Sequence, residues 1–166
     1  HDLFKLFKIF TNLYGNKIDH KGFQEIASAG DFIDLPDNTN LFELGEQSDS
    51  IFFLVSGLLK AFVPLNGSLI SVGEIYEGEV IGEMGILSDE PRSASVYSTR
   101  RSLVFKLSKS TTTMLMMKHP EIILQFANKI ADRLRLTSSK PEGTDIYSLL
   151  SLSIGEKQEL NKNYYD

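Results

Sequence analysis

The hydrophobic patterns along the chain predict a mainly β fold, a compact β-roll flanked by helices. Short apolar runs separated by turn residues fill the middle of the sequence, whereas both ends show the 3.6-residue spacing of amphipathic helices. Asn66-Gly67 lies between two of the apolar runs, and this pair favours a tight hairpin turn because both residues tolerate a positive φ. The middle of the chain is therefore expected to form antiparallel strands.

The first thirty residues predict two helices. Asp19 is a suitable N-cap for the second of them, and Gly30 is expected to end it. From there the spacing changes to that of strands. The apolar helix faces are expected to consist of Leu3, Leu6, Phe7, Phe10, Phe23, Ile26 and Ala27. Strands are expected at 32–35, 40–44, 51–55, 58–63, 69–72, 80–81, 93–97 and 103–107.

The chain becomes helical again after the last strand. Ser108 or Ser110 can cap a helix that ends at His119-Pro120, because proline favours a break there. Met114, Met116 and Met117 are expected to fill the core. The next helix, 121–138, carries an apolar stripe that packs on its own domain or forms a homodimer seam. The stripe consists of Ile123, Phe126, Ala127, Ile130 and Leu134.

Composition limits the classes of function. The chain has 166 residues, 42% of them hydrophobic, which suits one domain with extensions. A net charge of −5 argues against nucleic acid or an anionic membrane as the main partner of this chain. The absence of cysteine excludes disulfides and thiolate metal sites and fits a cytoplasmic protein, and no metal or cofactor is expected. The chain begins with His1, so we expect it to be part of a longer protein.

The stretch 82–96 has the features of an anion-binding cassette. Gly82 follows an apolar strand and permits a backbone conformation or a close approach that a Cβ would block. The short helical turn expected at 83–87 would present free N–H groups to a phosphate. Arg92, directly after Pro91, supplies a planar donor that suits phosphate oxygens.

A carboxylate beside a phosphate site needs another task, and Glu83 suits a sugar hydroxyl of the same ligand. That combination describes a nucleotide. The cassette has one Arg and no Lys, and no Gly-Lys-Ser/Thr loop occurs in the sequence, so a singly charged phosphate fits better than a triphosphate.

The cassette resembles that of the cyclic-nucleotide-binding domain family, in Gly82-Glu83 and in Pro91-Arg92-Ser93-Ala94-Ser95-Val96. The likeness extends over about residues 9–140. It implies a β-roll of the jelly-roll type between an N-terminal helical bundle (1–30) and two C-terminal helices (110–140), the roll occupying 31–109 and a tail or linker 141–166. It also implies that Glu83 binds the ribose 2′-hydroxyl. Arg92 would bind the cyclic phosphate, with the backbone of Gly82, Glu83 and Met84 and with Ser93 and Ala94.

The resemblance also implies that the second C-terminal helix, 121–138, is a lid over the base. The end of this lid helix is similar to that of the bacterial catabolite activators, in which a Thr-Ser pair contacts the adenine amino group. Thr137 and Ser138 would take that role here, which favours cAMP over cGMP and a protein of bacterial type. Pro141 breaks the helix and the tail after it is too short and too acidic for a helix-turn-helix module, so we expect no DNA-reading module within residues 1–166. The resemblance implies that ligand binding moves the C-terminal helices and so reaches an effector domain elsewhere in the protein.

Plainer interpretations stay open at this point. Gly82 and Gly85 also suit ordinary turns, Glu83 and Arg92 a surface ion pair, and the whole domain a degenerate scaffold that binds no nucleotide. Ser93 can reach phosphate or a guanine amino group, which keeps cGMP in view. Thr137 and Ser138 also suit a helix end. No catalytic motif occurs, and the chain is not expected to be an enzyme.

Overall fold

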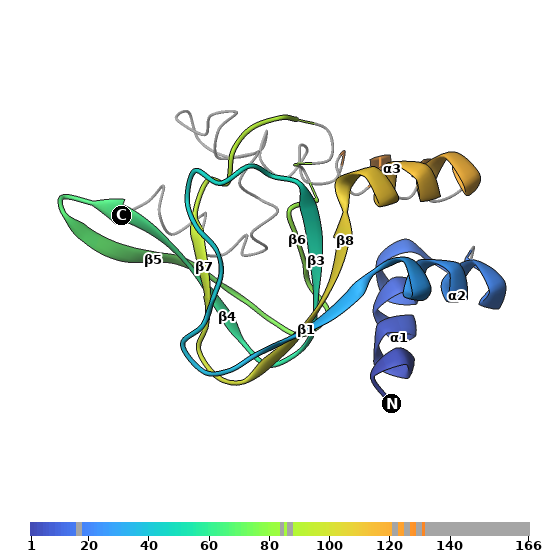
Figure 1. The fold of residues 1–166 in the computed structure, drawn as a ribbon, viewed down its shortest axis with the longest axis horizontal. Coiled ribbons are helices and arrows are strands. Elements are labelled where there is room, and N and C mark those ends of the chain that lie inside the picture. The colour runs from blue at the N-terminus through green and yellow to red at the C-terminus, as the bar shows by residue number, and fades with distance from the viewer. Residues whose placement is uncertain are drawn as a thin grey trace.

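The computed structural model of the chain describes residues 1–15, 18–83, 85, 88–120, 123, 124, 127, 128 and 131. Two helices precede eight strands, and a third labelled helix follows them (Figure 1). The elements are α1 (Asp2–Tyr14), α2 (His20–Ala29), β1 (Asp31–Leu35), β2 (Asn40–Phe42), β3 (Ser50–Ser56), β4 (Leu59–Leu65), β5 (Ser68–Ile75), β6 (Val80–Ile81), β7 (Ser95–Ser98), β8 (Ser102–Ser108) and α3 (Lys109–Lys118).

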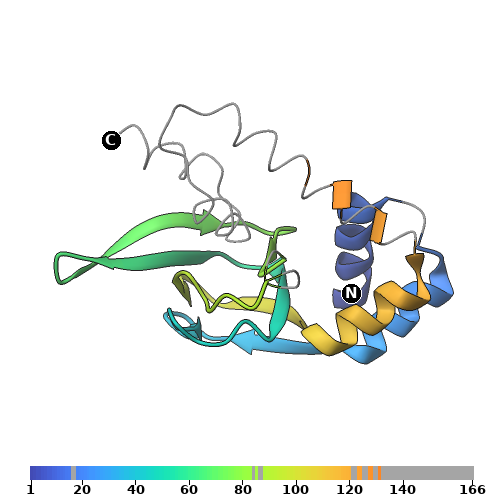
Figure 2. The same cartoon turned by 90° about the horizontal axis from the view of Figure 1, so that it is seen from above.

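The strands form two antiparallel four-stranded sheets, in the orders β1-β8-β3-β6 and β2-β7-β4-β5. Figure 2 shows the strands on one side of the molecule and the helices on the other. This is the mainly β roll with flanking helices that the sequence predicts. The hairpin β4–β5 turns at Asn66 and Gly67, whose φ values of 51° and 82° confirm the turn expected there.

The central strand β3 is buried on both faces, because its side chains alternate between two hydrophobic cores. Ile51, Phe53 and Val55 face the helices and belong to a core with residues of α1, α2, β8 and α3, which we call the helix-side core. Phe52 and Leu54 face the other sheet and belong to the core inside the roll, which we call the roll core. The continuous apolar run at 51–55 in the sequence therefore corresponds to a strand with a hydrophobic core on each face.

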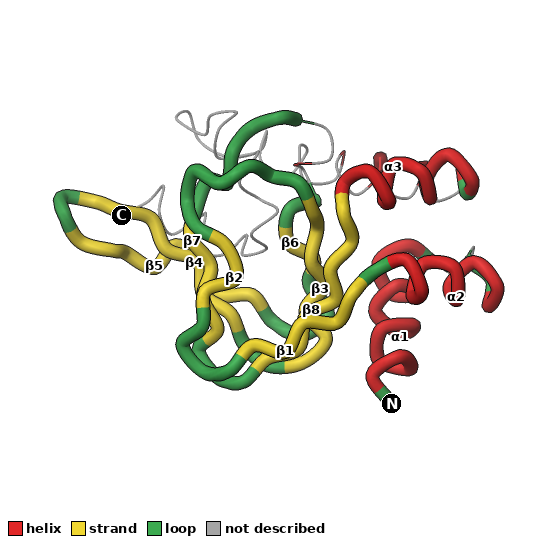
Figure 3. Tube along the Cα trace, viewed as in Figure 1, coloured by secondary structure: helices red, strands yellow, loops and turns green. Residues whose placement is uncertain are grey.

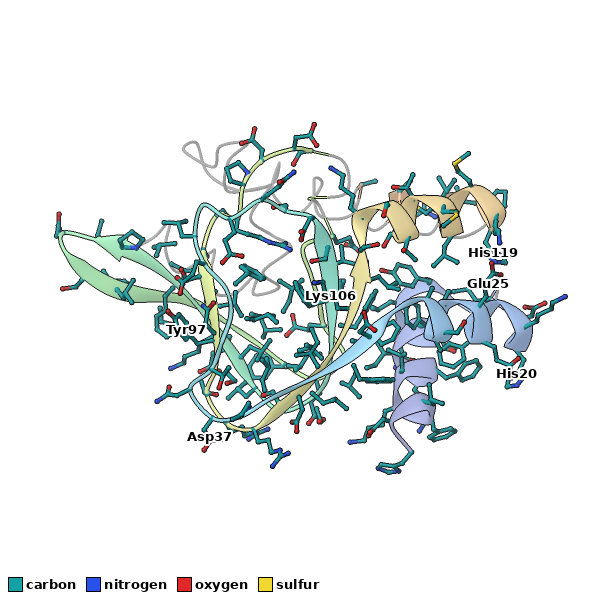
Figure 4. All side chains as sticks on the ribbon, viewed as in Figure 1. His20, Glu25, Asp37, Tyr97, Lys106 and His119 are labelled. Atoms are coloured by element: carbon teal, nitrogen blue, oxygen red, sulfur yellow. The ribbon has the colours of Figure 1, made fainter. Side chains whose placement is uncertain are left out.

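Caps and side-chain bonds fix the helices. Asp19 Oδ1 accepts a hydrogen bond from the Gly22 amide at 2.7 Å, and Ser108 Oγ accepts one from the Thr111 amide at 3.1 Å. The helices α2 and α3 are joined where Glu25 meets His119 (Figure 4). Both capping predictions are confirmed, with Ser108 as the cap of α3, and α3 ends at Lys118, before His119-Pro120.

The methionines of α3 do not behave as expected. The side chains of Met114 and Met117 are 55% and 76% exposed, so the prediction that they fill the core is wrong. The helix turns a narrow face to the sheet through Leu115 and Thr112, and Met116 alone of the three methionines packs against the helix-side core. None of the described helices is long and apolar enough to span a lipid bilayer.

Candidate functional site

Gly82 directly follows β6 and lies beside the Arg92 side chain. Its φ of +87° lies in the left-handed region, which a residue with a side chain rarely adopts. A Cβ built on it would lie 2.6 Å from Arg92 Nη1 and 3.0 Å from the Ser50 carbonyl oxygen. Both reasons given by the sequence for a glycine here are therefore confirmed.

Arg92 is buried in the wall of the roll, with only 6% of its surface exposed. Its Nη2 donates a hydrogen bond to the Ser50 carbonyl oxygen at 2.8 Å, and Cζ lies 4.2 Å from the centre of the Phe42 ring. A second ring, Phe52, lies 5.6 Å from Cζ and stacks with Phe42. The aromatic faces attract the cation and fix the plane of the guanidinium.

The charge of Arg92 has no direct counter-ion among the residues that the structure describes. Burial is the main influence on its pKa and lowers it, while the negative charges of Asp49 and Glu46 act in the opposite sense. A guanidinium stays protonated in proteins. Among the residues that the structure describes, Arg92 forms no ion pair with a carboxylate and its buried Nε has no hydrogen-bond partner. A buried cation of this kind favours an anion.

The backbone around Arg92 is held by the loop between β2 and β3, which Figure 3 shows in green. The Arg92 amide donates to the Glu46 carbonyl at 2.7 Å, and the Gly45 amide donates to the Arg92 carbonyl at 2.9 Å. Ser48 Oγ donates to the Glu90 carbonyl at 2.8 Å. The guanidinium is therefore positioned from both ends, by its side-chain contacts and by its own peptide groups.

Glu83 is fully buried, and its Oε2 accepts a hydrogen bond from the Tyr14 hydroxyl at 3.1 Å. Tyr14 is the last residue of α1 and belongs to the helix-side core. The interpretation of Glu83 and Arg92 as a surface ion pair is therefore wrong. Both side chains are buried, and each is held by another part of the chain.

The other predicted site residues lie as follows. Ala94 is 1% exposed and packs in the roll core, while Ser93 is half-buried. The Gly85 amide donates to the Gly82 carbonyl at 3.0 Å. Met84, Thr137 and Ser138 lie outside the described residues, as does most of the lid helix 121–138. Their roles stay predictions.

Sequence reasoning missed the residues that hold the two charged groups, namely Tyr14, Phe42, Ser50 and Phe52. Phe52 belongs to an expected strand, and the alternation along it could have placed its side chain opposite that of Phe53. No local signal indicates that Tyr14 meets Glu83, because 69 positions separate them. Such contacts depend on the packing of α1 against β3.

Comparison with known proteins identifies the class. The profile of the cyclic nucleotide-binding domain matches residues 32–119, more than half of the chain, and the chain belongs to that family. It resembles the catabolite activator protein of Thermus thermophilus, with a TM-score of 0.67 and 21% identity over 78% of this chain and 59% of the other. It also resembles the regulatory domain of Toxoplasma gondii PKA, solved with cAMP, with a TM-score of 0.65 and 18% identity over 92% of this chain and 57% of the other. At these identities the likeness shows the shared fold.

A curated relative is fungal. Lysophospholipase NTE1 of Phaeosphaeria nodorum is 27% identical over 140 residues, which make up 84% of this chain and 9% of that protein. The chain thus corresponds to a small part of that relative. The match supports neither a bacterial nor a fungal origin for this protein, so the bacterial assignment stays a prediction.

Proposed function

We propose that this chain is a regulatory domain that binds a cyclic nucleotide, cAMP in preference to cGMP. The observation that supports it is the buried guanidinium of Arg92, which has no described carboxylate in direct contact and lies beside Gly82 in a cassette within the family match. A singly charged ring phosphate offers the oxygens that this cation can bind. No cofactor or metal takes part in the proposal.

Each part of the ligand has a proposed partner. Arg92 binds the phosphate together with backbone groups of the cassette, and Glu83 accepts a hydrogen bond from the ribose 2′-hydroxyl. The backbone contribution comes from Gly82, Glu83, Met84, Ser93 and Ala94. Thr137 and Ser138 are the proposed contacts of the adenine base, and they carry the preference for cAMP.

Binding is proposed to act on a separate effector through the C-terminal helices, α3 and the helix 121–138. A ligand shifts the positions of these helices only if it binds one arrangement more tightly than the other. The name of the fungal relative offers one candidate output, hydrolysis of a lysophospholipid by another part of a longer protein. The same proposal includes a cytoplasmic location and a homodimer formed through the helix 121–138. In the longer protein, this chain is the regulatory part.

Calorimetry with cAMP and Arg92→Leu tests the phosphate site. We expect the variant to lose about 2–5 kcal/mol of binding free energy, because it removes one partner of a buried charged pair. Arg101→Leu is the matched control, since Arg101 is exposed and pairs with Asp34 at the end of β1. Undiminished cAMP binding by Arg92→Leu would reject the site, and equal losses in both variants would indicate nonspecific attraction.

A degenerate interaction domain is the second candidate, because Glu83 and Arg92 already have protein partners in Tyr14 and Ser50. It predicts that neither cAMP nor cGMP raises the melting temperature, since a ligand stabilises a protein only by binding its folded state. A rise in melting temperature that increases with nucleotide concentration would exclude this candidate. Neither the proposed sensor nor the degenerate interaction domain is expected to convert cAMP to AMP.

A further inference from the structure

The hydrogen bond between Tyr14 and Glu83 links two parts of the protein that are far apart in sequence. The Tyr14 hydroxyl lies 3.1 Å from Glu83 Oε2, and the two side chains are 3% and 0% exposed. Tyr14 is held in place by α1, whose Phe10 ring packs against Phe53 of β3 with a centroid distance of 4.7 Å. The phenol is therefore presented to Glu83 by a packed helix.

The two charged residues of the cassette contact different cores. Arg92 lies over Phe42 and Phe52, which belong to the roll core, while Glu83 contacts Tyr14, which belongs to the helix-side core. The backbone that leads into Glu83 is nevertheless close to the Arg92 guanidinium, since Gly82 precedes Glu83 and a Cβ on it would lie 2.6 Å from Arg92 Nη1.

A buried carboxylate requires hydrogen-bond donors, because its desolvation is costly without them. A phenol and a sugar hydroxyl are both neutral O–H donors, so one can replace the other at the same oxygen. The Tyr14 ring also lines an apolar cavity of about 30 Å³ together with Phe10, Ile51 and Phe53, so the ring is not closely packed on every side.

We propose that Tyr14 and the ribose 2′-hydroxyl of the ligand compete for the Glu83 carboxylate, and that Tyr14 thereby sets the affinity for ribose-containing cyclic nucleotides. The proposal rests on the proposed function. A nucleotide that carries the 2′-hydroxyl replaces the Tyr14 bond, and this exchange removes the polar link between α1 and the cassette. A nucleotide without that hydroxyl leaves the link in place.

The test compares Tyr14→Phe with the wild-type chain, using cAMP and 2′-deoxy-cAMP as probes in calorimetry. We expect cAMP to bind the variant about tenfold more tightly, because the ligand no longer displaces a hydrogen bond. The affinity for 2′-deoxy-cAMP stays unchanged, so the ratio of the two affinities rises about tenfold. Tyr76→Phe is the control, since it removes another phenol–carboxylate bond, to Glu74, on an exposed surface.

Other results would overturn the proposal in distinguishable ways. If wild type binds cAMP and Tyr14→Phe binds it more weakly or with an unchanged affinity ratio, the competition is wrong and the proposed function stands. If neither protein binds either nucleotide, both proposals fail. A second measurement does not depend on how well the variant folds. Titration of wild type should shift the NMR signals of the Tyr14 ring with cAMP and leave them in place with 2′-deoxy-cAMP, and equal shifts would overturn the competition.

Discussion

The two cores on either side of β3 hold their polar groups in different ways. In the roll core a cation, Arg92, lies against two aromatic rings and bonds a backbone carbonyl. At the helix-side core an anion, Glu83, meets a phenol from a separate helix. The first arrangement is built within the roll, whereas the second exists only when α1 is docked.

This difference assigns separate tasks to the two cores. The rings under Arg92 orient its guanidinium and are expected to affect ligand binding directly. The helix-side core holds α1, α2 and α3 on the sheet and is expected to affect the ligand indirectly, through Tyr14 and Glu83 and through the position of α3. Variants that disturb one core at a time test this division.

The largest effects are expected from the two neighbouring rings of β3. Phe53→Ala and Phe52→Ala should each lower the free energy of unfolding by about 3–5 kcal/mol, because both rings are buried. Only Phe52→Ala should also weaken cAMP binding beyond the loss of folded protein, since Phe52 lies under Arg92. Urea denaturation gives the stability and calorimetry on folded protein gives the affinity. Equal effects on affinity would contradict the division between the cores.

A smaller effect is expected at Gly82, where the two cores meet. Gly82→Ala should cost about 1–2 kcal/mol of stability, because alanine is strained at φ +87°. Its Cβ should also displace Arg92, so cAMP affinity falls more than stability does. Gly67→Ala is the matched control. That glycine, in the turn between β4 and β5, also has a positive φ, of 82°, but a Cβ there meets nothing within 4 Å. Equal losses of affinity in the two variants would show that strain, and not contact with Arg92, is responsible.

The smallest effect is expected from the exposed pair of Asp34 and Arg101, away from both cores. The hydrogen bond from Arg101, with a smaller charge contribution, holds the pKa of Asp34 below its ordinary value of 3.8. A lowered pKa in the folded chain means that the pair stabilises the protein above about pH 3.8 and that this contribution is lost as the pH falls through the lowered value. Asp34→Asn should therefore leave the melting temperature nearly unchanged at pH 7, and a large drop would contradict the weak pair expected on a surface.

Much of the fold follows from local signals. Asp19, Ser108 and the pair Asn66-Gly67 mark boundaries that the structure confirms, because capping and positive φ are properties of one turn of chain. The need for glycine at position 82 could be predicted for the same reason, because a positive φ is a local property of the chain. The methionines of α3 show the limit of this reasoning, since Met114 and Met117 are apolar and yet exposed. Which face of a short helix is covered depends on the sheet beneath it.

The sequence alone determined the order of the strands and helices, their caps and turns, and the presence of a carboxylate and a guanidinium nine positions apart in one cassette. These features depend on residues that are near one another along the chain. Only the tertiary structure decided that Arg92 rests on Phe42 and Phe52 and that Glu83 bonds Tyr14. Such contacts join segments that meet because β3 is buried between two cores, and no short stretch of sequence specifies that meeting.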